Sequence, residues 1–287
     1  VAAVLGGAAV TIIGELIAAP LLGLLHVPDE VFPLALLYLR IYLLGMPVIL
    51  LYNFEAAIFR SVGETKIPLL ALAASGVLNV ILNLFFVIVL HMTVNGVATA
   101  TVISNAVSSL ILYQRLRTTT LEIRVEPRSL RIDPISLRRI LQIGLPAGIQ
   151  SAVFSVANIV IQSAINSLGT IVMAASSAAY NIEVFTYDIL NSFSQACTTF
   201  VGQNFGAGNP QRCKKTLLLC LGEGICILGV AIAAILFWGK PLLSIFDSNP
   251  EVIETGYIRL MLVVSAHSFS LLYEVMAGYL RGFGISL

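Results

Sequence analysis

Apolar residues fill most of this chain in long stretches, which short polar breaks separate. A helix needs about 20 residues to cross the hydrocarbon core of a bilayer. Eight of the stretches are that long or longer. They cover residues 1–26, 33–60, 67–91, 94–115, 144–168, 171–205, 214–239 and 252–280. The pattern predicts an all-α polytopic membrane protein with eight transmembrane helices.

One break differs from the others in length and charge. The segment Arg115–Arg139 is polar and contains seven arginines. It divides the predicted helices into two groups of four. We therefore expect three parts: a first helical lobe over 1–116, a linker with a short amphipathic helix over 117–143, and a second lobe over 144–287.

The distribution of basic residues predicts an orientation. Cytoplasmic loops of membrane proteins carry an excess of Lys and Arg. With Arg115–Arg139 inside, thirteen of the sixteen basic residues fall on the cytoplasmic side. The three exceptions are Arg40, Lys240 and Arg259. The long linker is therefore predicted to be cytoplasmic.

Composition agrees with a membrane protein. The hydrophobic fraction is 58% and the charged fraction is 11%, whereas soluble domains have roughly 25% charged residues. The four cysteines form no CxxC motif and lie near no histidine cluster, so we interpret them as small apolar residues within helices. Pro47 and Pro146 lie inside predicted spans, where a proline removes a backbone hydrogen bond and can kink the helix.

The chain also repeats itself at an offset of 221 residues. Pro20-Leu21-Leu22 aligns with Pro241-Leu242-Leu243, Glu30 with Glu251, Arg60 with Arg281 and Gly63 with Gly284. Both copies have the same predicted orientation, so the repeat is parallel, about an axis along the membrane normal. Completing it requires two spans before Val1 and two beyond Leu287. We thus expect eight helices of a twelve-helix, two-lobe protein of on the order of 420 residues.

Several segments resemble one transporter family. They are AAIFRSVGETKIP, NGVATATVIS, GLPAGIQSAVFSVANIVIQSAINSLG, TTFVGQNFGAGNPQRCKK and GYLRGFGIS. They are similar to the third to tenth spans of the multidrug and toxic compound extrusion (MATE) family. The resemblance implies a multi-pass protein of the bacterial inner membrane that acts as a monomer. It also implies export of organic, often cationic, compounds in exchange for H⁺ or Na⁺, by rocking of the two lobes. No cofactor beyond the coupling ion and no nucleic acid is implied.

Two predicted helices carry polar stripes that are candidates for a water-filled cavity. In 144–168 the polar residues recur on one helical face, and in 171–205 the spacing repeats. The candidate cavity-lining residues are Ser155, Asn158, Gln162, Asn166, Asn181, Asn191 and Gln195. The alternative is that these side chains bond neighbouring helices together.

Acidic residues at bilayer depth are candidates for coupling, because a buried carboxylate either binds a proton or pairs with a cation. The four candidates are Glu274, Asp188, Glu183 and Glu55. Asp188 lies on the polar stripe of its helix, whereas Glu183 does not. Each of the four could instead be a structural partner of a nearby polar group. The sequence does not define a metal site.

Two other functions remain open alternatives. A related lipid-linked oligosaccharide flippase would share the two-lobe plan but would need a strongly cationic cavity for a pyrophosphate. The predicted stripes contain amides, hydroxyls and an acid, without Lys or Arg. An intramembrane enzyme would need a catalytic pair at bilayer depth, and the three histidines are isolated from one another. A transporter for neutral or cationic compounds, and not an enzyme, is therefore the leading prediction.

Overall fold

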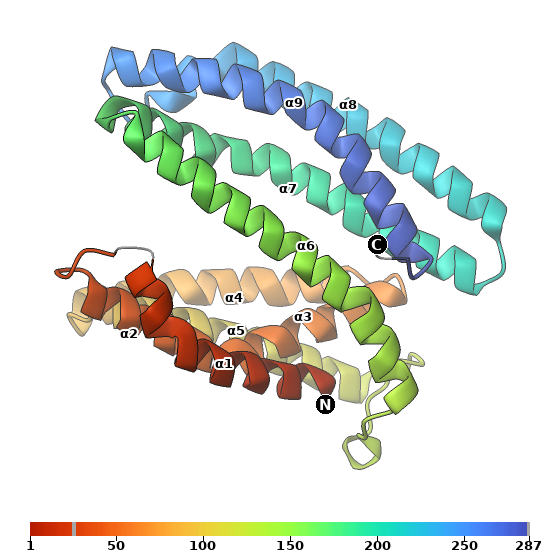
Figure 1. Ribbon diagram of the computed structural model, residues 1–287. Coiled ribbons are helices and arrows are strands. Elements are labelled where there is room, and N and C mark those ends of the chain that lie inside the picture. Colours follow the sequence, from red (N-terminus) through yellow and green to blue (C-terminus); the bar gives the residue numbers. More distant parts are fainter. Residues whose placement is uncertain (25–26, 286–287) are drawn as a thin grey trace. The chain divides into compact units, whose positions relative to one another are not determined.

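The structure, a computed structural model, describes residues 1–24 and 27–285 (Figure 1). The helices in chain order are α1 (Ala2–Leu24), α2 (Phe32–Leu44), α3 (Met46–Ser61), α4 (Lys66–Leu84), α5 (Val94–Thr118), α6 (Pro134–Ser167), α7 (Thr170–Gly206), α8 (Pro210–Leu243) and α9 (Pro250–Gly282). A π-helical turn, Phe85–Val89, extends α4, and a short 3₁₀ helix covers Pro127–Ser129. This part of the chain contains no strand, which confirms the all-α prediction. The last two residues of the first predicted span lie outside the described residues.

Most of the predicted spans correspond to helices with the length and apolarity of a membrane crossing. Six such helices are present, and the bent pair α2–α3 raises the number to seven. The remaining predicted span, 171–205, coincides with α7, which is 37 residues long. Helix α7 is not among the six helices whose length and composition suffice for a membrane crossing. The protein is thus an all-α polytopic membrane protein.

The chain divides into two compact units, Val1–Leu137 and Arg138–Leu287. In the linker 117–143 we expected a short amphipathic helix. The residues from Pro134 onward form the first turns of α6. The Asp133 carboxylate accepts a hydrogen bond from the backbone N–H of Ser136 at 2.9 Å. A side-chain cap with proline at the first helical position favours helix initiation at this point.

In the first unit, the pair α2–α3 is bent by 47° at Gly45. Pro47 follows the break and has no backbone N–H, so the Leu43 carbonyl, four residues earlier, loses its helical donor. The Thr11 hydroxyl of α1 donates to that carbonyl at 2.6 Å. The predicted effect of Pro47 is confirmed, and α1 supplies the hydrogen bond that the kink removes.

In the second unit, α7, α8 and α9 pack side by side (Figure 1). Their shared cores contain Leu190, Val201, Leu228 and Leu271, each at most 1% exposed. Helix α6 differs, since none of its described residues is buried. The second unit is therefore a tight three-helix bundle accompanied by a helix that remains accessible along its length.

The internal repeat is visible in local geometry. Shifted by 221 residues, α1 falls on α8, and α2–α3 falls on α9. Gly63 has φ +81° and its counterpart Gly284 has φ +80°. Both follow the basic end of a helix, where the left-handed conformation suits glycine. One difference stands out: α9 is continuous where α2–α3 is bent, because Ser268 occupies the position that corresponds to Pro47.

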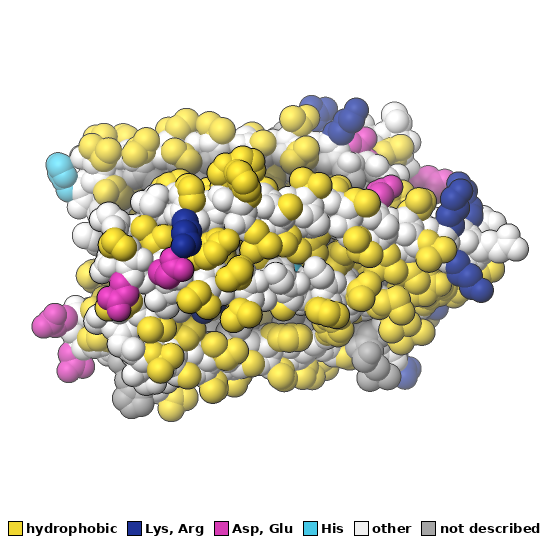
Figure 2. Space-filling model, turned by 90° about the horizontal axis from the view of Figure 1, so that it is seen from above, with side chains coloured by type: hydrophobic (Ala, Val, Ile, Leu, Met, Phe, Trp, Pro, Cys, Tyr) yellow, Lys and Arg dark blue, Asp and Glu magenta, His cyan; other side chains and the backbone are white. Residues whose placement is uncertain are grey.

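The outer surface is apolar, as membrane contact requires. Leu16, Phe185, Phe237 and Phe269 are each more than 70% exposed. Figure 2 shows a face that is largely hydrophobic, with charged side chains mainly toward the helix ends. Exposed apolar surface on this scale is typical of contact with lipid or with further protein.

A labelling experiment tests the predicted orientation. Thr120, after α5, and Ser248, before α9, are both exposed and lie in opposite kinds of loop. In a variant without the four native cysteines, Ser248→Cys should react with a membrane-impermeant maleimide in intact cells. Thr120→Cys should react only after lysis, because the arginine-rich segment is predicted to be cytoplasmic. The reverse pattern would invert the topology.

Candidate functional site

The strongest helix contact in the second unit joins α7 to α9. The Ser194 hydroxyl donates to the Glu274 carbonyl at 2.7 Å, and the Thr198 hydroxyl donates to the Gly278 carbonyl at 2.9 Å. A Cβ atom added to Gly278 would lie 2.4 Å from the Ser194 carbonyl oxygen. The two backbones therefore lie almost in contact, as small residues permit in membrane helices. This contact fixes which faces of α7 and α9 remain open.

The predicted polar stripe of α7 lies on its open face. Asn181, Asp188, Asn191 and Gln195 are all exposed. Their bonds are made within the helix: the Asn181 amide donates to the Ser177 carbonyl at 2.9 Å, and the Gln195 amide donates to the Asn191 side-chain oxygen at 3.4 Å. These residues do not bond α7 to α8 or α9. The stripe is therefore free for other contacts, as a cavity wall would be.

The structure brings together two of the acidic candidates. Tyr187, half exposed on α7, interacts electrostatically with Asp188 beside it and with Glu274 of α9. Arg281 and Tyr273 of α9 belong to the same cluster. Among the described residues, no side chain donates a hydrogen bond to either carboxylate. Two acids without a hydrogen-bond donor thus act electrostatically on one half-exposed tyrosine.

The stripe of α6 is also exposed. Ser155, Asn158, Gln162 and Asn166 are open to the surface, and the Gln162 amide donates to the Asn166 side-chain oxygen at 2.8 Å. The part of the chain that the structure describes contains no hydrogen bond between the stripes of α6 and α7. Helix α6 instead bonds to the acidic cluster, because the Gln150 amide donates to the Tyr273 hydroxyl. A shared cavity lined by both stripes stays a prediction.

Glu183, the third candidate, is bound on both oxygens. The Arg259 guanidinium donates to one at 2.8 Å and to the other at 3.0 Å. Glu183 is 6% exposed, and a bidentate pair with arginine is the strongest arrangement available to a buried carboxylate. Nearby, Thr186 is hydrogen-bonded to His267 at 2.7 Å, also between α7 and α9. Glu183 here connects two helices, rather than presenting a free carboxylate.

Glu55, the fourth candidate, belongs to the first unit and to a different environment. It is 3% exposed, and the Ser109 hydroxyl of α5 donates to one of its oxygens at 2.8 Å. Its other oxygen has no hydrogen-bond partner in the described structure. It is a buried acid, distinct from the exposed acids of α7.

Three residues of the site were not predicted from the sequence: Tyr187, Tyr273 and Arg259. Tyr187 and Tyr273 resemble ordinary aromatic residues of a lipid-facing helix, and nothing local marks them as neighbours of the acids. Arg259 did carry a signal, because it is one of the three basic residues that fall outside the predicted cytoplasmic side, and it lies inside a predicted span. An intramembrane arginine requires a partner, so its pairing with an acid could have been anticipated.

Long apolar helices, with an exposed polar and acidic face on α7, define a multi-pass membrane protein. The chain belongs to the MatE family, whose model matches residues 1–85 and 146–287. This agrees with the MATE resemblance of its motifs, and the proteins of this family are transporters.

Individual relatives support the assignment. A probable multidrug resistance protein of Bacillus subtilis, YpnP, is 30% identical over 96% of this chain and 61% of its own length. An FAD transporter of Shewanella oneidensis is 26% identical over 86% of this chain and 56% of its own length. A crystal structure of a MATE transporter in complex with MaD3S superposes with a TM-score of 0.89 at 22% identity, covering 99% of this chain and 64% of that one. The chain spans about three fifths of the length of such relatives.

Proposed function

We propose that the protein exports organic cations across the bacterial inner membrane in exchange for H⁺ or Na⁺, by alternating access. The observation that carries this proposal is the acidic cluster around Tyr187. Asp188 and Glu274 reach it from two helices, on a face that the helix packing leaves open. The names of the multidrug relatives support the same class of cargo, and the relatives' bacterial sources support the location.

The charge of the cluster favours a cationic cargo. The groups that act on Tyr187 include two carboxylates, those of Asp188 and Glu274, and one guanidinium, that of Arg281, so their formal charge at neutral pH is −1. The exposed rings of Tyr187 and Tyr273, 50% and 45% accessible, supply apolar area and π faces. Aromatic rings beside carboxylates are a general arrangement for binding organic cations.

The same carboxylates suit ion exchange. A carboxylate at bilayer depth without a direct partner gains from binding either a proton or a cation. If cargo and coupling ion compete for Asp188 and Glu274, occupation by one releases the other. Competition of this kind couples the two fluxes without a separate ion site. We further propose that one copy of the protein forms the complete transport unit.

A second candidate cargo is an anionic dinucleotide. Arg281 lies within the cluster, and one relative is named an FAD transporter. A guanidinium recognises a phosphate through paired hydrogen bonds. Under this alternative Arg281 would bind the cargo, and the carboxylates would serve the coupling ion alone.

Efflux assays on the full-length protein test the proposal and distinguish the two candidate cargoes. In a drug-sensitised host, Asp188→Asn or Glu274→Gln should reduce ethidium efflux to the level of the empty host at unchanged membrane expression. Each substitution keeps size and removes charge. Loss of efflux on adding a proton ionophore, or on removing Na⁺, identifies the ion.

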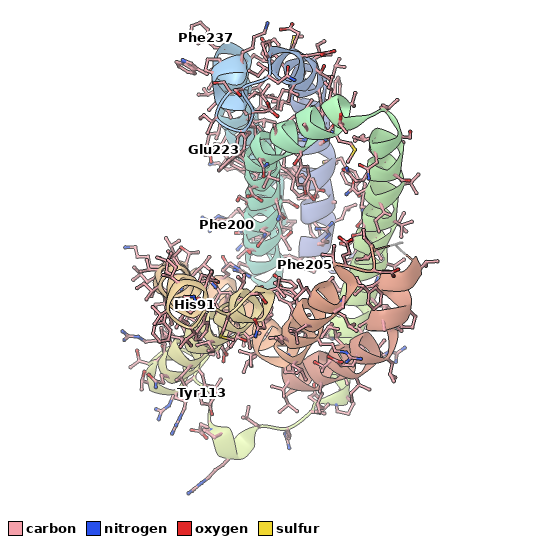
Figure 3. The ribbon with its side chains drawn as sticks, turned by 90° about the vertical axis from the view of Figure 1, so that its left-hand side faces the viewer. His91, Tyr113, Phe200, Phe205, Glu223 and Phe237 are labelled. Atoms are coloured by element: carbon pink, nitrogen blue, oxygen red, sulfur yellow. The ribbon has the colours of Figure 1, made fainter. Side chains whose placement is uncertain are left out.

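Glu223 provides the matched control. It is an exposed acid on α8 (Figure 3), outside the cluster. Glu223→Gln should leave ethidium efflux unchanged. Wild-type efflux from both cluster variants would contradict the proposal, and FAD export that depends on Arg281 would favour the second candidate.

A further inference from the structure

A second acid of different character is buried in the first unit. The Glu55 side chain of α3 is 3% exposed, and Ser109 of α5, which contacts it, is 4% exposed. One helical turn further along, Phe59 and Leu112 are fully buried in the apolar cluster between the same two helices. Glu55 therefore lies inside a helix interface, away from both lipid and water.

The hydrogen bonds of this carboxyl group are incomplete. The Ser109 hydroxyl donates to Oε2 at 2.8 Å, whereas Oε1 has no partner among the described residues. An ionised carboxylate in such a place would lose several hydrogen bonds to water and regain one. Burying an isolated ionised carboxylate costs so much that such groups ordinarily become neutral.

No neighbouring charge compensates for that burial. Helix α3 packs against α1, α2, α4 and α5. Their acidic, basic and tyrosine side chains, with those of α3 itself, are Glu15, Tyr38, Arg40, Tyr42, Tyr52, Arg60, Lys66, Tyr113, Arg115 and Arg117. In the described structure none of them forms a hydrogen bond or ion pair with Glu55, and Glu15 is instead paired with Arg40 at 3.3 Å.

A divalent metal cation does not fit the site either. Hard cations such as Ca²⁺ and Mg²⁺ take roughly six or more oxygen ligands. Glu55 has one hydroxyl beside it, and no group of three or more His, Cys, Asp or Glu side chains gathers anywhere in the described residues. Because the carboxyl group is already covered by its own unit, a further segment of chain could reach it only if α3 and α5 moved apart.

We propose that Glu55 is a proton-binding site, independent of the acidic cluster on α7 and α9. Oε1 carries the proton, and Oε2 accepts the hydrogen bond from Ser109. When α3 and α5 separate enough to admit water, the O–H bond breaks, the proton passes to water, and the carboxylate remains hydrated. Proton binding at Glu55 is thus linked to the packing of these two helices.

Infrared spectroscopy of the full-length protein in lipid vesicles tests this site without any transport assay. At neutral pH the wild-type protein should show the carbonyl band of a neutral carboxylic acid, shifted by exchange into D₂O. Glu55→Gln should remove that band while keeping the shape of the side chain. Ser109→Ala should move the band to higher frequency, because the carbonyl oxygen loses its donor.

Glu15→Gln is the matched control, since Glu15 is also inside a helix of this unit but is ion-paired. That variant should leave the band intact. A wild-type spectrum identical to that of Glu55→Gln, in vesicles where both proteins are folded by circular dichroism, would overturn the proposal. So would a band that Glu15→Gln removes. Failure of the efflux prediction would leave these spectra unchanged, so the two proposals stand or fall separately.

Discussion

Arg259→Leu is expected to destabilise the second unit by about 3–5 kcal/mol, the cost of removing one partner of a buried ion pair. The substitution leaves Glu183, 6% exposed, without either of its two guanidinium hydrogen bonds at 2.8 and 3.0 Å. The leucine cannot supply a hydrogen-bond donor to the carboxylate. Thermal unfolding of the purified protein in detergent should show this loss.

The chain offers a matched control in a second ion pair. Lys240 Nζ lies 2.5 Å from Glu254 Oε2, but the two side chains are 50% and 58% exposed. Exposed pairs contribute about 0–1 kcal/mol, so Glu254→Gln should barely change the unfolding temperature. The double variant Glu183→Leu with Arg259→Leu should recover much of the lost stability, because no buried charge remains. Equal shifts for Arg259→Leu and Glu254→Gln would contradict the role assigned to the buried pair.

The second large effect is expected at Gly278. In Gly278→Ala the new Cβ would lie 2.4 Å from the Ser194 carbonyl oxygen and 2.8 Å from its hydroxyl. Alanine is better than glycine in a helix by about 1 kcal/mol, but overpacking costs about 1–3 kcal/mol or more. Overpacking should prevail, because the obstructing atom belongs to the backbone of α7 and cannot rotate away. The α7–α9 contact should loosen and the unfolding temperature should fall.

Gly229→Ala distinguishes packing from helix propensity. Gly229 lies within α8, and a Cβ there would meet nothing within 4 Å. This variant should be neutral, or more stable by up to about 1 kcal/mol. The measurement is the same detergent unfolding assay. A Gly278→Ala protein as stable as Gly229→Ala would show that α7 and α9 can adjust their separation.

The fold was largely predictable because the sequence signals for a membrane helix lie within the helix itself and its flanking residues. A run of apolar residues, a charged break or a proline acts within its own segment, so the spans and the kink at Pro47 followed from the sequence. The start of α6 was not predicted. There Asp133 and Pro134 initiate a helix that continues directly into the membrane span, and a charged amphipathic stretch does not reveal whether it joins the next helix.

The site was less predictable, since its contacts join residues far apart in the chain. Glu183 and Arg259 are 76 positions apart, and their pairing depends on which faces α7 and α9 present to each other. The polar stripe of α7 was found from its spacing alone. That Tyr187 lies near Glu274 depends on the relative rotation of two helices, which periodicity does not specify.

The bend between α2 and α3 also gives the two repeats different mechanical properties. At Gly45 the chain already departs from a straight rod by 47°, and a single side-chain bond from Thr11 of α1 reaches the Leu43 carbonyl there. Bending α9 at the corresponding place would require breaking consecutive backbone bonds of an intact helix. We therefore expect a change of helix angle to cost less in the first copy of the repeat than in the second.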